Sequence, residues 1–249
     1  MPAVASIGAI SGRDTAVTAE GLDHSRRRHA CPPPGSPERA RTATGATREA
    51  ILTAAERLFA EHGMYAASDR QVSEAAGQGN NAAVGYHFGT KADLVRAVAR
   101  RHAERIEALR ERAIVAAGDS RDVRDWVDCL VRPVTEHLAA LGSPTWYARF
   151  CAQVMTDPVL HEIMLEESMA SPALRQAVEG LNRNLPELPP EVRAERGQMV
   201  RLLILHTCAE RERTLAEGAP TPRATWAEAA DGLADAVLGL WLAPVSPPR

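Results

Sequence analysis

The stretch SDRQVSEAAGQGNNAAVGYHFGTKADL, from Ser68 to Leu94, decides the fold. It begins with a capping box, Ser68–Gln71, a pattern in which two side chains satisfy backbone N–H groups at a helix start. Gly77-Gln78-Gly79 predicts a turn. Asn80-Asn81 is expected to cap a further short helix that runs to about His87. Two short helices around a tight turn are typical of a helix-turn-helix, a motif whose second helix enters the DNA major groove.

Helical periodicity flanks this stretch on both sides. A helix is expected to begin at Thr47 and end at Gly63, with one apolar face formed by Ile51, Leu52, Ala55, Leu58 and Phe59. On the other side, Thr90-x-x-Asp93 predicts the start of a long helix. Its expected buried stripe is Leu94, Val98, His102, Ile106 and Leu109. Three short helices and a long one are therefore predicted within residues 47–117.

The turn and the second short helix have the residue types that DNA reading requires. Small residues at Ala75–Gly77 let the two helices approach, and Val72 and Val84 are the expected packing partners beneath them. The residues from Asn80 to Tyr86 would then project outward. Asn pairs with adenine edges, and small residues let the backbone approach the bases or touch thymine methyl groups.

The sequence closely resembles the TetR family of bacterial regulators over about 50 residues. The residues that carry the resemblance are Thr47-Arg48, Ile51-Leu52-x-Ala54-Ala55-x-x-Leu58-Phe59-Ala60-Glu61-x-Gly63, Val72-x-x-Ala75-Ala76-Gly77 and Tyr86-His87-Phe88-Gly89-Thr90-Lys91-x-x-Leu94. The resemblance implies an all-α homodimer whose N-terminal helix-turn-helix binds a palindromic operator. It also implies a divergent C-terminal domain with a small-molecule pocket and the dimer interface, and repression as the default mode.

The resemblance assigns DNA contacts by position. The expected phosphate contacts are Arg48, Ser68, Tyr86, His87 and Lys91, and the expected base-reading or groove-facing residues are Asn80, Asn81, Ala82 and Gly85. Eight residues separate Gly77 from Tyr86, one more than the common pattern, so the register of the recognition helix stays open by one residue. Plainer roles are also open: Phe88 is expected in the core, and Arg70 either touches DNA or pairs with Glu74.

Further helices are expected near 121–141, 144–156, 158–183, 190–217 and 223–242, separated by prolines. The predicted effector pocket comprises Trp126, Leu130, Trp146, Phe150, Val154, Met155 and Met164. Aromatic and Met side chains suit a pliable apolar pocket, but they equally suit plain core. The predicted dimer interface comprises Met199, Leu203, His206, Trp226, Leu233, Val237 and Trp241, unless these side chains pack in their own subunit. An apolar or amphipathic effector is the hypothesis.

The expected domain organisation has four parts. Residues 1–45 are predicted to be a disordered extension, either a passive tail or a basic arm that touches phosphates. A helix-turn-helix domain spans 46–92, an effector-binding and dimerisation domain spans 93–243, and a tail spans 244–249. Residues 44–117 hold nine Arg, one Lys and nine acids, whereas residues 118–249 hold thirteen Arg and nineteen acids. DNA is therefore expected to meet the N-terminal side.

Composition and motifs favour no other class of protein. Four widely spaced cysteines form neither a metal-ligand pattern nor a disulfide framework, so a reduced, cytoplasmic setting is expected, with no metal and no cofactor. No apolar run of about 18 residues predicts a membrane span. An enzyme would need a phosphate-binding loop, a metal cluster or a nucleophile motif, and none is present. A protein-binding adaptor on the same helices remains the other alternative; it would lack salt-sensitive DNA binding.

Overall fold

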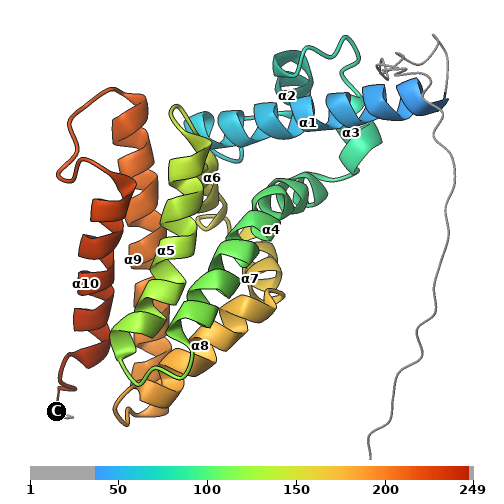
Figure 1. The fold of residues 1–249 in the computed structure, drawn as a ribbon. Helices are drawn as coiled ribbons and strands as arrows, with labels where there is room; N and C mark the ends of the chain where they lie inside the picture. The colour runs from blue at the N-terminus through green and yellow to red at the C-terminus, as the bar shows by residue number, and fades with distance from the viewer. Residues whose placement is uncertain (1–36, 247–249) are drawn as a thin grey trace, which may run out of the picture. The chain divides into compact units, whose positions relative to one another are not determined.

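A computed structural model describes the chain from Pro37 to Ser246, with side chains from Ala43 onward (Figure 1). This part is all-helical, which confirms the predicted fold class. Its ten helices are α1 (Pro37–His62), α2 (Asp69–Ala75), α3 (Ala83–Phe88), α4 (Lys91–Ala117), α5 (Val123–Leu141), α6 (Tyr147–Val154), α7 (Leu160–Met169), α8 (Pro172–Asn184), α9 (Pro190–Ala216) and α10 (Trp226–Leu242). Residues from Arg41 onward form one compact unit. None of these helices is both long and apolar enough to cross a membrane.

The first helix begins earlier than the sequence predicts. α1 starts at Pro37, ten residues before Thr47, so the predicted disordered extension is wrong for residues 37–45. Proline suits the first position of a helix because its missing N–H would have no partner there. The rest of that extension, residues 1–36, lies outside the described residues. The predicted tail 244–249 is described only as far as Ser246.

Two other element boundaries differ from expectation. The predicted helix 158–183 is split into α7 and α8, because Ser171 caps a new helix whose first residue is Pro172. α3 begins at Ala83 with no side-chain cap, later than Asn80-Asn81 predicts. The Asn80 carboxamide instead accepts a hydrogen bond from the Ala82 N–H at 2.9 Å, which closes a turn just before the helix.

α4 is the central helix of the larger, C-terminal part of this unit. It packs against α5, α7 and α8, while α5 also packs against α8 and α10, and α6 lies against α9 (Figure 1). All five residues of the stripe predicted for α4 are buried. One apolar core runs continuously from Ile51 in α1 to Trp241 in α10.

The packing of α5 against α8 depends on one glycine. Trp126 of α5 is 2% exposed, and its indole donates a hydrogen bond to the Ser120 carbonyl at 2.9 Å. A Cβ on Gly180 of α8 would overlap the Trp126 ring. Only glycine therefore permits this approach of the two helices.

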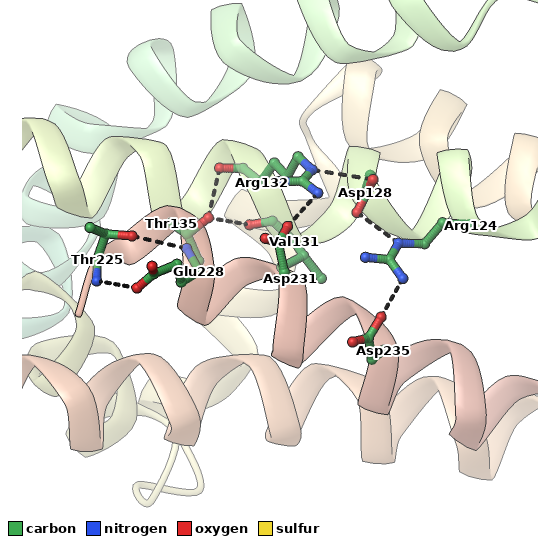
Figure 2. Close-up of polar contacts among 9 residues, drawn as sticks. All are labelled: Arg124, Asp128, Val131, Arg132, Thr135, Thr225, Glu228, Asp231 and Asp235. Carbon is green, nitrogen blue, oxygen red and sulfur yellow. Dashed lines mark hydrogen bonds and ion pairs between the residues drawn. The ribbon is translucent and has the colours of Figure 1, made fainter. Parts of the chain in front are cut away.

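An ion-pair network holds α10 along α5 (Figure 2). Asp128 of α5 accepts from Arg124 Nε at 3.3 Å and from Arg132 Nε at 3.2 Å, so it orients both guanidinium groups. Arg132 then reaches Asp231 of α10 at 2.8 Å, and Arg124 pairs with Asp235 one turn further along α10. Because the network is partly exposed, we expect it to fix the register of α10 more than to stabilise the fold.

Candidate DNA-binding surface and effector cavity

The helix-turn-helix forms as the sequence predicts. The Ser68 hydroxyl accepts from the Gln71 N–H at 3.3 Å, and the side-chain carbonyl oxygen of Gln71 accepts from the Ser68 N–H at 2.9 Å, which confirms the capping box of α2. Gly77 ends the helix with φ of 69°, a left-handed conformation that glycine adopts without strain. Val72 and Val84 have no exposed surface and pack between α2 and α3.

The predicted reading surface is exposed on the turn and on α3. Asn80, Asn81, Ala82 and Gly85 are all exposed, and a Cβ on Gly85 would meet no atom within 4 Å. The Tyr86 side chain is 84% exposed, which is unusual for an aromatic residue in a folded domain. Its ring meets the edge of His87 at 5.1 Å, whereas Phe88 is buried in the core as expected.

The predicted phosphate contacts lie around this surface and also have intramolecular partners. Arg48 of α1 is exposed and its guanidinium lies 4.8 Å from the centre of the Phe88 ring. The Lys91 ammonium donates to the carbonyls of Met64 at 2.7 Å and Ala67 at 3.0 Å, so it holds the loop between α1 and α2. Arg70 pairs with Glu74 at 2.7 Å, the plainer of its two expected roles.

A largely apolar cavity of about 510 Å³ lies between α4 and α9, within the usual size range of small-molecule sites. α5, α6, α7 and α8 complete its walls, and Trp241 of α10 also lines it. Leu130, Met155 and Met164 of the predicted pocket line this cavity.

Four residues of the predicted pocket lie elsewhere. Trp126 packs on Gly180, and Phe150 and Val154 are fully buried core residues, with Phe150 6.3 Å from Phe59 of α1. The Trp146 indole donates to Glu61 of α1 at 3.1 Å. The spacing of apolar residues along a helix therefore predicts which side chains are buried. It does not distinguish core residues from residues that line a cavity.

The polar residues of the cavity were not predicted from the sequence. Arg110, Arg193 and Arg201 line it together with Glu107 and Tyr147. Arg110 is 6% exposed, and burial lowers the pKa of its guanidinium. A signal existed, since Arg110 follows Ile106 by four residues and so continues the buried stripe of α4 with a charge.

A buried polar network connects the helix-turn-helix part to the cavity. The Glu56 carboxylate of α1, 3% exposed, accepts from His102 Nε2 of α4 at 2.9 Å and also pairs with Arg101. His102 Nδ1 lies 2.8 Å from His137 Nε2 of α5. Because a carboxylate only accepts, His102 Nε2 carries the proton in the first bond. The network thus ties α1, α4 and α5 together beside Tyr147.

Glu212 of α9 provides a second buried anchor, at the start of α6. Its carboxylate, 1% exposed, accepts from the N–H groups of Ala148 at 3.1 Å and Arg149 at 2.9 Å. Burial raises the pKa of Glu212, although these N–H groups and the Arg149 guanidinium act in the opposite direction.

Burial likewise raises the pKa of the Cys129 thiol to about 11 and that of Cys208 to about 12, so both are unreactive thiols.

The predicted dimer residues divide into two groups. Leu233, Val237 and Trp241 of α10 are buried in their own subunit, and Trp226 is half-buried beneath the Arg211 guanidinium, 5.0 Å from its ring centre. Leu203 packs against the core. Met199, 45% exposed, and His206 point outward from α9. The stripe of α10 thus faces α5 and α9 of the same chain.

Comparisons with known proteins identify the two parts of the chain. Residues 51–98 match the model of bacterial regulatory proteins of the tetR family, and residues 128–239 match that of the tetracyclin repressor-like C-terminal domain. The chain is 29% identical over 153 residues to the HTH-type transcriptional repressor AcnR of Corynebacterium glutamicum, covering 59% of this chain and 73% of that protein. It is 41% identical to AcnR of Corynebacterium efficiens over 70 residues, 28% of this chain and 37% of that protein.

Solved structures of similar proteins include two regulators of the same type. The TetR-like regulator LfrR from Mycobacterium smegmatis, in complex with proflavine, is 24% identical and has a TM-score of 0.44, covering 82% of this chain and 99% of that chain. PfmR from Thermus thermophilus is 17% identical, with a TM-score of 0.47 and coverage of 81% and 98%. The two family models match in the expected order, with the N-terminal helix-turn-helix first. The chain therefore belongs to the TetR family of bacterial regulators, which are DNA-binding proteins and not enzymes.

Proposed function

We propose that this regulator is a cytoplasmic repressor that binds a palindromic operator as a homodimer and is released by a small amphipathic effector. The observation that carries the proposal is the exposed polar surface of α3 and its preceding turn, on a buried helix-turn-helix scaffold. The AcnR proteins, to which the chain is similar, are repressors by name. Residues 46–92 would then form the reading head, and residues 93–243 the effector and dimer domain.

The reading head supports base contacts from the turn and phosphate contacts from its borders. Asn80 and Asn81 are exposed beside Ala82 and Gly85, so the backbone of the turn has room to approach base edges. Tyr86, His87, Arg48 and Ser68 surround them and provide phosphate donors. Lys91 acts there chiefly by holding the loop that precedes α2, since its ammonium is occupied by two carbonyls.

The homodimer would use the outer faces of α9 and α10. Met199 and His206 on α9 and Ala236 and Gly239 on α10 are exposed in the single chain. Small residues allow two helices to approach closely, which suits a four-helix interface around a two-fold axis. Size-exclusion chromatography with light scattering tests this homodimer. The variant Met199→Arg should shift the measured mass toward that of the monomer. Val115→Arg, at a similarly apolar exposed position of α4, should leave the dimer intact.

The effector cavity would act on the reading head through the buried network. Tyr147 lines the cavity and stacks on His102, which bonds to Glu56 of α1. A ligand that moves α6 or α4 changes these contacts and with them the position of α1. Two reading heads must match half-sites at a fixed spacing, so a small rotation is enough to weaken operator binding.

Selection from random duplexes tests the operator part of the proposal. The purified protein should enrich an inverted repeat whose half-sites lie about one or more helical turns apart. Enrichment of a single half-site, or of no sequence, would contradict the palindromic operator.

A further inference from the structure

Several polar groups that line the cavity are hydrogen-bond donors with few protein acceptors. Within residues 43–246, the Arg110 guanidinium makes one hydrogen bond, from Nε to the Cys129 carbonyl at 3.3 Å, and no ion pair within 4 Å, although the Glu107 carboxylate acts on it electrostatically. Arg201 has one weak contact, to the Met155 sulfur at 3.8 Å. Trp241 is 5% exposed, and its indole nitrogen has no hydrogen-bond partner in that part of the chain. A buried donor without a partner is costly, which indicates that something else supplies the acceptor.

The acceptors that line the cavity are already occupied. Glu167 is bound by Arg100 at 2.7 and 2.8 Å and by Arg96 at 3.1 Å. Glu107 accepts from the Ala173 N–H at 2.8 Å and from the Ser171 hydroxyl, at the start of α8. Asn182 accepts from Arg193 at 3.1 Å. Three arginines and two carboxylates line the cavity, and Glu167 is already paired with two further arginines, so positive charge exceeds negative charge at its walls.

We propose that the cavity binds an amphipathic organic anion, with its carboxylate on Arg110 and its apolar body along the walls of α5, α7 and α9. This inference rests on the proposed function, because it names the chemical class of the effector. An arginine presents a planar pair of donors that matches a carboxylate, and the low-polarity surroundings strengthen the pair. Arg201 and the Trp241 indole offer further donors on the same cavity. A cationic headgroup in the same place would be repelled by the Arg110 guanidinium.

Three probes with one tail and different headgroups test the proposal on the full-length protein without DNA. Laurate, dodecanol and dodecylamine are titrated below their aggregation concentrations by calorimetry. We expect laurate to bind at least about tenfold more tightly than dodecanol, because its carboxylate makes a charge-assisted hydrogen bond. We expect dodecylamine to bind most weakly of the three. Equal affinity for laurate and dodecanol, or preference for dodecylamine, would overturn the proposal.

Matched variants locate the carboxylate. Arg110→Met keeps most of the side-chain volume and should reduce laurate affinity to the level of dodecanol, without changing dodecanol binding. Arg112→Met changes an exposed arginine two residues along α4 and should leave both affinities unchanged. Unchanged laurate binding in Arg110→Met would contradict the site. If Arg110→Met does not fold, Arg201→Met provides the second variant, with a smaller loss expected for laurate alone.

Adding the selected operator duplex separates this inference from the proposed function. Laurate that binds as expected and lowers operator affinity supports both. Laurate that binds as expected but leaves operator affinity unchanged supports the anion site and contradicts its role as the effector site. If all three probes weaken operator binding by the protein to the same extent, the result would contradict the anion preference while supporting the effector role.

Discussion

The ring of Tyr147 stacks on the imidazole of His102, with ring centroids 3.9 Å apart and an angle of 22° between the planes. Tyr147 lines the cavity, and His102 bonds to Glu56 of the first helix at 2.9 Å. Tyr147 and His102 therefore connect the cavity to the first helix. This short connection leads to a measurable coupling between the two parts of the chain.

A double-mutant cycle between Glu56 and His102 should measure that coupling. Because both side chains are buried and the acceptor is a carboxylate, we expect a coupling energy of about 1.5–3 kcal/mol in chemical denaturation. The exposed Arg70–Glu74 pair serves as the control, with an expected coupling of about 0.5 kcal/mol or less. A Glu56–His102 coupling energy no larger than that of the control pair would show that this network does not couple α1 to α4.

Stability should fall in mild acid because of His137. Burial, followed by the neighbouring His102, lowers the pKa of His137 from 6.5 to about 4, while Glu56 opposes the shift and Arg105 adds to it. Between these two values the unfolded chain binds a proton that the folded chain does not, so unfolding becomes easier as the pH falls. The loss should reach at most about 3 kcal/mol below pH 4 and be absent above pH 7.

Denaturation at several pH values checks this effect. His137→Gln should flatten the stability profile between pH 7 and pH 4, whereas His62→Gln, at the exposed end of α1, should leave its slope unchanged. An unchanged slope in His137→Gln would assign the acid sensitivity to other groups.

Gly180→Ala should destabilise the protein by about 1–3 kcal/mol, because the new methyl group overlaps the Trp126 indole. The same change at Gly45 in α1, where a Cβ meets nothing within 4 Å, should be neutral or stabilise by roughly 0.5–1 kcal/mol through helix propensity. Thermal unfolding compares the two variants. A stabilising Gly180→Ala would mean that α5 and α8 are not in this close contact.

Tyr86→Ala should weaken operator binding by about fivefold or more without lowering the melting temperature, because an 84% exposed ring contributes little to the core. Tyr65→Ala is the matched control: that ring is equally exposed, but it lies before α2, and the nearby Asp157 raises the pKa of its hydroxyl. Its operator affinity should stay within about twofold of the original. Equal losses of operator affinity in both variants would show that Tyr86 does not contact the operator.

The sequence predicts the helix-turn-helix well because its signals are local. Capping boxes at Ser68 and Thr90 depend on residues three apart, and the structure confirms both. The cavity could not be predicted in this way, since Phe150 and Met155 lie on neighbouring turns but only Met155 reaches the open space. The charge of Arg110 on a buried stripe is a sequence signal for the cavity, but its meaning depends on its having no ion pair among residues 43–246, which only the packed helices reveal.

The most direct test of the account measures how Asn81 affects discrimination between DNA sequences. Fluorescence anisotropy compares the selected operator with a scrambled duplex at two salt concentrations, for the original protein and for Asn81→Ala. We expect tight, salt-sensitive binding of the operator, and a loss of discrimination by roughly 1–3 kcal/mol in the variant if Asn81 reads a base. Equal losses on both duplexes would contradict the base-reading role. Equal, salt-insensitive binding of the two duplexes by the original protein would contradict sequence-specific DNA binding and favour the adaptor.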